Sequence, residues 1–183
     1  NPYMPIQDIG GDDFMAAHPT WDGRDVRIGI VDSGVTLDHP SLQTTSTGLR
    51  KIIEWVTFTD PLTDGDPTWV QMSADYVKGP SFTWNAVNYT APGNKKYRIG
   101  LFNERVATLG GEVGSDVNRD GNPPSSNGVF PILWDVSKDT VWVDTNQNNN
   151  FADDMAMKPY SVNYDVNYFG TDNPATPVAE RMP

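Results

Sequence analysis

The run from Val26 to Val31 constrains the fold more than any other stretch of the sequence. It reads Val-Arg-Ile-Gly-Ile-Val, so it is mostly apolar and rich in β-branched residues. Such a run is typical of a strand that is buried on both faces of a parallel sheet. The sequence therefore predicts an α/β architecture at this end of the chain, with residues 26–31 as one strand of a parallel sheet.

Asp32 follows this strand directly, with the small residues Ser33 and Gly34 behind it. In open α/β sheets the reacting groups gather at the carboxyl ends of the strands, which makes Asp32 a candidate catalytic residue. Asp-Ser-Gly is equally ordinary chemistry for a turn. It also occurs in aspartic peptidases, which need two such carboxylates close together, so a chain with a single copy would have to act as a homodimer.

The wider stretch over residues 22–42 reads DGRDVRIGIVDSGVTLDHPSL. It resembles the first catalytic block of the subtilisin-like serine peptidases, in which an apolar strand is followed by Asp-Ser/Thr-Gly and then by His-Pro-x-Leu. The resemblance implies that Asp32 is the aspartate of a Ser-His-Asp triad, which fixes the tautomer of the catalytic histidine and stabilises its imidazolium. His39 matches a position of this block that is not the catalytic histidine, so we expect it to pack or bond in a turn.

Residues 42–66 and 132–170 are similar to the tripeptidyl peptidase II branch of the same family. That branch carries a long insertion between the catalytic Asp and the catalytic His, which in subtilisin are only about thirty residues apart. The resemblance implies that residues 1–60 form the first part of a doubly wound parallel-sheet catalytic domain. Residues 61–183 would then be a β-rich, loop-rich insertion lobe, and the fold would be incomplete without the C-terminal remainder of the peptidase.

Local patterns predict several elements of this organisation. A short helix is expected over residues 12–17, where the following His-Pro pair ends it. Two strands are expected over residues 128–135 and 140–143, and the four residues between them suit a hairpin. We expect Trp134 and Trp142, which lie in these strands, to be core residues.

The other two catalytic blocks of the family are absent from the sequence. Only His18 and His39 are present, neither of them in a His-Gly-x-His context, and no serine stands in Gly-Thr-Ser. We therefore expect the chain to contribute only the triad aspartate and to be inactive alone. Its partners would be a peptide or protein substrate and the C-terminal remainder of the same peptidase, which carries the His and the Ser. The chain would be a fragment: a proteolytic product that stays bound to that remainder, which we favour, or a piece cut at the insertion.

Two loops rich in Asp and Asn predict Ca²⁺ sites. Both place oxygen-bearing side chains at alternate positions of a tight turn, which can direct them toward one ion. Neither loop has the Glu that completes an EF-hand, and Asp, Asn and Gly are also simple turn-formers. The candidate ligands are Asp116, Asn118 and Asp120 in the first loop, and Asp144, Asn146, Asn148, Asn150 and Asp153 in the second, where Asp154 is an alternative to Asp153.

Charge and composition exclude several classes of function. The 183 residues include 24 acidic and 13 basic side chains and no cysteine, for a net charge of −11. This balance is unsuited to nucleic acid or anionic lipid, which need Lys and Arg. The absence of cysteine excludes disulfides, thiolate metal sites and a Cys nucleophile. Both features fit a secreted or extracellular protein, although they leave an intracellular one open.

A second function stays open at this point. A non-catalytic, calcium-stabilised β-rich binding or structural module would explain the acidity, the two Asp/Asn loops and the missing His and Ser blocks. It would not explain an apolar strand that ends at Asp32 and is followed by His-Pro-Ser-Leu at residues 39–42.

Overall fold

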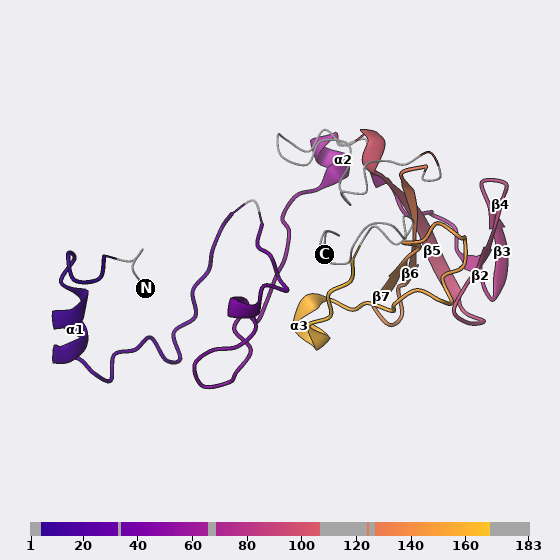
Figure 1. Ribbon diagram of the computed structural model, residues 1–183. Helices are drawn as coiled ribbons and strands as arrows, with labels where there is room; N and C mark the ends of the chain where they lie inside the picture. The colour runs from indigo at the N-terminus through magenta and orange to yellow at the C-terminus, as the bar shows by residue number, and fades with distance from the viewer. Residues whose placement is uncertain (1–4, 33, 66–68, 107–123, 125–126, 169–183) are drawn as a thin grey trace. The chain divides into compact units, whose positions relative to one another are not determined.

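The computed structural model describes residues 5–32, 34–65, 69–106, 124 and 127–168 (Figure 1). The chain divides into two compact units, residues 1–35 and residues 36–183. The domain boundary predicted near residue 60 stays a prediction. Within the described ranges, no helix is long and apolar enough to cross a membrane.

The first unit contains one helix, α1 (Gly11–Ala17), where the sequence predicts it. The acidic residues of its first turn lie at the positive end of the helix dipole, which stabilises the helix. The helix ends at His18, the residue before a proline. The ring of His18 stacks on Trp21 with 4.1 Å between centroids, and Phe14 lies 4.8 Å from His18. These three rings form an aromatic cluster at the end of the helix.

The parallel strand predicted over residues 26–31 is not formed. The segment is extended but unpaired, and Ile28 and Ile30 are 80 % and 82 % exposed. A strand in a parallel sheet must pair with neighbouring strands, and the connection between two such strands is a crossover of a dozen or more residues. Among the described residues of the first unit, no second strand is present to supply them. The doubly wound parallel sheet is therefore not observed here, and the mixed helix and strand content is the part of the predicted α/β class that the structure supports.

The second unit is built on antiparallel strands with short helical turns at its ends. Its elements in chain order are η1 (Pro40–Leu42), α2 (Pro61–Asp64), β1 (Trp69–Val70), β2 (Val77–Lys78), β3 (Ser81–Trp84), β4 (Val87–Thr90), β5 (Lys96–Asn103), η2 (Glu104–Val106), β6 (Val129–Asp135), β7 (Thr140–Val143) and α3 (Tyr160–Asn163).

A five-stranded sheet forms the centre of this unit. Its main path runs β1-β5-β6-β7, and β2 pairs with the first part of β5. The predicted hairpin is confirmed: β6 and β7 pair antiparallel, with Asp135 opposite Thr140 and Asp139 at a positive φ of 45° in the connection. The lobe that follows α2 is thus β-rich, and its sheet is antiparallel throughout.

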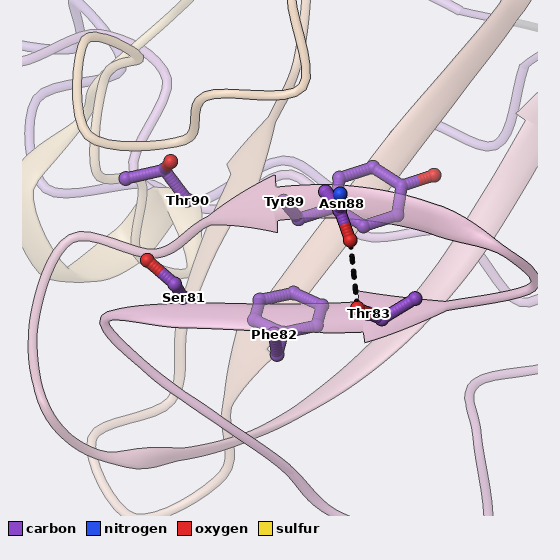
Figure 2. Close-up of a pocket in the computed structure, with 6 residues that line it drawn as sticks. All are labelled: Ser81, Phe82, Thr83, Asn88, Tyr89 and Thr90. Carbon is purple, nitrogen blue, oxygen red and sulfur yellow. Dashed lines mark hydrogen bonds between the residues drawn. The ribbon is translucent and has the colours of Figure 1, made fainter.

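Strands β3 and β4 form a separate two-stranded hairpin (Figure 2). Its turn residues Asn85 and Ala86 both have positive φ, at 48° and 63°, as a type I′ turn requires. On the outer face, the Thr83 hydroxyl donates a hydrogen bond of 2.7 Å to Asn88 Oδ1. On the inner face, Tyr89 is buried and joins the core beside the sheet.

Both faces of the main sheet bury apolar side chains. Ile99 of β5 lies opposite Leu133 of β6, and both are fully buried in the cluster that includes Trp142 and Phe151. On the other face, Phe102 lies opposite Phe130 in a second cluster. Trp142 is a core residue, as predicted, whereas Trp134 is half-buried and its indole N–H donates to Asp139 at 3.3 Å.

Asp135 is a buried charge at the end of β6. One of its oxygens accepts hydrogen bonds from the amide and the hydroxyl of Ser137, at 3.0 and 2.6 Å. The other accepts from Lys95 Nζ at 3.0 Å. Burial opposes ionisation, but the bonds from Ser137 and Lys95 outweigh it and hold the pKa of Asp135 below its ordinary value.

We expect Asp135→Asn to lower the free energy of unfolding by about 1–3 kcal/mol at pH 7. The substitution removes the ion pair with Lys95 and leaves the new side-chain amide at position 135 buried with incomplete hydrogen bonding. The lowered pKa makes this contribution complete above about pH 4 and lost as the pH falls further. Urea unfolding at pH 7 and pH 3 measures both effects. Asp139→Asn, in the same hairpin but exposed, is the control; an equal loss in the two variants would contradict the assignment.

Candidate functional site

Asp32 lies at the end of the extended segment 26–32, and its side chain is exposed. Ser33 lies outside the described residues. Among the described residues, the segment before Asp32 belongs to no sheet.

The chain that follows forms a closely hydrogen-bonded loop over residues 37–51. Gln43 is its centre: Nε2 donates to the carbonyl oxygens of Leu37 at 2.7 Å and His39 at 3.0 Å. Its Oε1 accepts from the Arg50 guanidinium at 2.9 Å. An antiparallel bridge between Thr44 and Arg50 closes the tip of the loop.

His39 has the local role that the sequence predicts. Its Nδ1 accepts the backbone N–H of Ser41 at 3.2 Å, and the residue caps the turn η1. Pro40, in the first position of that turn, needs no hydrogen-bond donor of its own. His39 is therefore a turn residue.

The last described segment returns to this loop, a contact that the sequence analysis did not predict. The Tyr168 hydroxyl donates to Asp38 Oδ2 at 2.9 Å, although the two residues are 130 positions apart. The Arg50 guanidinium carbon lies 4.6 Å from the centre of the Tyr164 ring, in a cation–π contact. The only signal in the sequence was the recurrence of tyrosine in this segment, which names no partner.

The second predicted calcium loop is described in full, whereas the first, with Asp116, Asn118 and Asp120, lies outside the described residues. Asn146, Asn148 and Asn150 each accept, through Oδ1, the backbone N–H two residues further on. Asp144 is fully buried and accepts from the amides of Asn148 and Asn149. These side-chain oxygens therefore accept hydrogen bonds from amides of the loop itself, and their role as metal ligands stays a prediction.

Burial and neighbouring carboxylates raise the pKa of two acids in this loop, Asp144 and Asp154. Burial raises the pKa of Asp144 despite its bonds to backbone amides. Burial, followed by the charge of Asp144, raises the pKa of Asp154 to about 7. Asp154 Oδ2 is buried without a hydrogen-bond partner. Asp153 accepts a hydrogen bond from the side-chain amide of Asn148. Even so, no three acidic or imidazole side chains among the described residues are grouped closely enough to hold a metal ion.

A shallow depression of about 350 Å³ lies on the β3–β4 hairpin (Figure 2). It is lined by Ser81, Phe82, Thr83, Asn88, Tyr89 and Thr90. None of these side chains is charged at neutral pH, and Tyr89, whose pKa is raised by burial, keeps its proton. The depression therefore offers hydroxyl and amide groups but no acid, base or activated nucleophile.

Comparison with known proteins confirms the class that the motifs indicate: the relatives are subtilisin-like serine peptidases. Pyrolysin of Pyrococcus furiosus is 28 % identical over 182 residues, which cover 81 % of this chain and 12 % of pyrolysin. Tripeptidyl-peptidase 2 of rice is 53 % identical over 51 residues, or 28 % of this chain. The Arabidopsis thaliana enzyme of the same name is 35 % identical over 86 residues.

The predicted similarity to the tripeptidyl peptidase II branch is thereby confirmed. The chain spans only a small part of each relative, 12 % of pyrolysin and 4 % of the rice tripeptidyl-peptidase 2. No family model matches the chain. No solved structure matches it either.

Proposed function

We propose that the chain is the Asp-bearing segment of a subtilisin-like serine peptidase and that Asp32 is the triad aspartate. The observation that carries the proposal is the block over residues 22–42, in a chain of which 81 % aligns with pyrolysin. The reaction is hydrolysis of a peptide bond through an acyl-enzyme. In this proposal, the His and the Ser belong to the C-terminal remainder of the peptidase, which is also the partner of this segment.

The role of Asp32 follows from its chemistry. Its carboxylate accepts a hydrogen bond from Nδ1–H of the catalytic histidine, which leaves Nε2 free to take the proton of the serine hydroxyl. The negative charge then stabilises the imidazolium that forms.

The exposed segment 26–31 supports the same proposal. Val26, Ile28, Ile30 and Val31 present branched apolar side chains to solvent. Burial of such side chains contributes about 1.5–3 kcal/mol each, so the segment gains stability only when further strands cover it. We infer that the remaining strands of a parallel sheet, in the rest of the peptidase, provide that cover. A secreted location, predicted from charge and cysteine content, stays a prediction.

We expect Asp32→Asn in the full-length peptidase to lower kcat by about 10⁴-fold, the loss typical of this change in Ser-His-Asp triads. The substitution keeps the size of the side chain and removes its charge, so the histidine adopts the wrong tautomer. Hydrolysis of a chromogenic peptide measures the effect.

Asp25→Asn is the matched control, because Asp25 is an exposed acid of the same segment and asparagine tolerates its φ of 67°. It should keep full activity. Wild-type activity in Asp32→Asn would overturn the proposal. The isolated chain, which lacks the His and Ser blocks, should not react with a fluorophosphonate.

The alternative is a calcium-stabilised β-rich module without catalysis, which the buried carboxylates of the second loop favour.

Independently of catalysis, we propose that Ca²⁺ binds this loop through Asp144 and Asp153, or Asp154 in place of Asp153, with the amide oxygens of Asn146, Asn148 and Asn150. The support is the buried, unpartnered Oδ2 of Asp154 and the raised pKa of both buried carboxyls. Binding would require the Asn oxygens to leave the amides that they now accept from.

We expect free Ca²⁺ at a hundred times its Kd to raise the free energy of unfolding by about 2.7 kcal/mol, measured by urea unfolding with and without chelator. Asp153→Asn, at an exposed position that keeps an acceptor for Asn148, should reduce this gain, and Asp139→Asn should not. Calorimetric stoichiometry in an Asp120→Asn variant decides whether the first loop binds a second ion. No effect of Ca²⁺ on the wild type would exclude the site.

A further inference from the structure

Two segments far apart in the sequence meet at one place in the second unit. Residues 38–50 belong to the loop that follows Asp32, and residues 160–168 are the last described part of the chain. They contact each other through the hydrogen bond from Tyr168 to Asp38 and through the cation–π contact of Arg50 with Tyr164. Between them the chain runs out through α2, the sheet and the Asp/Asn loop, and back.

Each side of this contact is held by its own surroundings. Arg50 is fixed by Gln43, which also binds two carbonyl groups of the loop. Tyr164 ends α3 in the left-handed region, at a φ of 60°, and its N–H donates to the Tyr160 carbonyl at 2.8 Å. The Tyr160 ring is buried and meets Tyr164 edge to face, with 5.4 Å between centroids.

Tyr164 lies at the C-terminal cap of α3, where a left-handed residue commonly ends a helix, and one local and one distant side chain contact its ring. A non-glycine residue with positive φ costs on the order of 1 kcal/mol and persists only where its surroundings fix it. Here the fixing contacts are the Tyr160 ring on one side and the Arg50 guanidinium on the other. The turn at Tyr164 directs the chain toward Asp38, which Tyr168 reaches four residues later.

We propose that Asp38, Arg50, Tyr164 and Tyr168 form a clamp at the base of the lobe and act as positioning residues for catalysis. This inference rests on the proposed function. Asp38 follows Asp32 by six residues, a span of at most about 20 Å of chain. Because Tyr168 binds Asp38, the chain that leaves the insertion starts again within this distance of Asp32. The long insertion therefore need not separate Asp32 from the catalytic residues that follow it.

Tyr168→Phe in the full-length peptidase tests the clamp, because it removes only the hydroxyl that donates to Asp38. We expect kcat to fall by about tenfold with KM within about twofold, since the substrate contacts stay and the relative placement of the triad changes. Asp38→Ala should give the same loss, and the double variant no greater loss, because both remove one interaction. Asp38→Asn, which keeps an oxygen acceptor for the tyrosine, should recover most of the activity.

Tyr76→Phe is the matched control. Tyr76 is an exposed tyrosine that carries an arginine, Arg98, 4.7 Å from its ring centre, much as Tyr164 carries Arg50. Loss of its hydroxyl should leave kcat unchanged. Backbone hydrogen exchange gives a readout separate from catalysis: Tyr168→Phe should speed exchange over residues 37–51, and Tyr76→Phe should not.

A covalent replacement of the hydrogen bond completes the test. The 183 residues contain no cysteine. A variant with Asp38→Cys and Tyr168→Cys therefore has two thiols in this chain, which a short bifunctional maleimide can join. Cross-linking should restore the kcat that the uncoupled double variant loses. Unchanged kcat and exchange in Tyr168→Phe, or no recovery on cross-linking, would overturn the clamp while Asp32→Asn still abolishes activity. Full activity of Asp32→Asn would instead refute the proposed function, and the exchange result would then decide the clamp alone.

Discussion

The antiparallel ladder between β5 and β6 is the interaction on which the second unit depends. Its six registered pairs run from Arg98 opposite Trp134 to Asn103 opposite Val129. β1 and β2 attach to one side of this pair and β7 to the other, and both hydrophobic clusters form on its two faces. The backbone groups of β5 and β6 form hydrogen bonds with each other. With the two clusters on its faces, the sheet gives this lobe a core of its own.

The first unit shows the opposite situation. Its apolar segment 26–31 has the composition of a strand buried on both faces, but the described residues around it contain no partner strand. The same chain therefore combines a lobe with its own core and an apolar segment that is exposed and outside any sheet among the described residues. In the function that we propose, further strands of the peptidase cover that segment.

Local patterns were sufficient for α1, the β6–β7 hairpin and the turn role of His39, because each depends on neighbouring residues. The β3–β4 hairpin was not predicted, because its type I′ turn has Ala86 where glycine is the usual signal. The contact between Asp38 and Tyr168 was out of reach for any local pattern. In the Asp/Asn loop, the alternating oxygen-bearing residues predicted metal ligands, but the pattern could not show that backbone amides of the loop donate to those oxygens.

The exposure of residues 26–31 has a consequence for synthesis of the protein. These residues leave the ribosome before every strand of the lobe, at about 5–20 residues per second. A β-branched segment with unpaired backbone groups is a template for pairing with other chains during that delay. Arg27, the second residue of the run, places a charge within it, and such a charge opposes pairing with other chains.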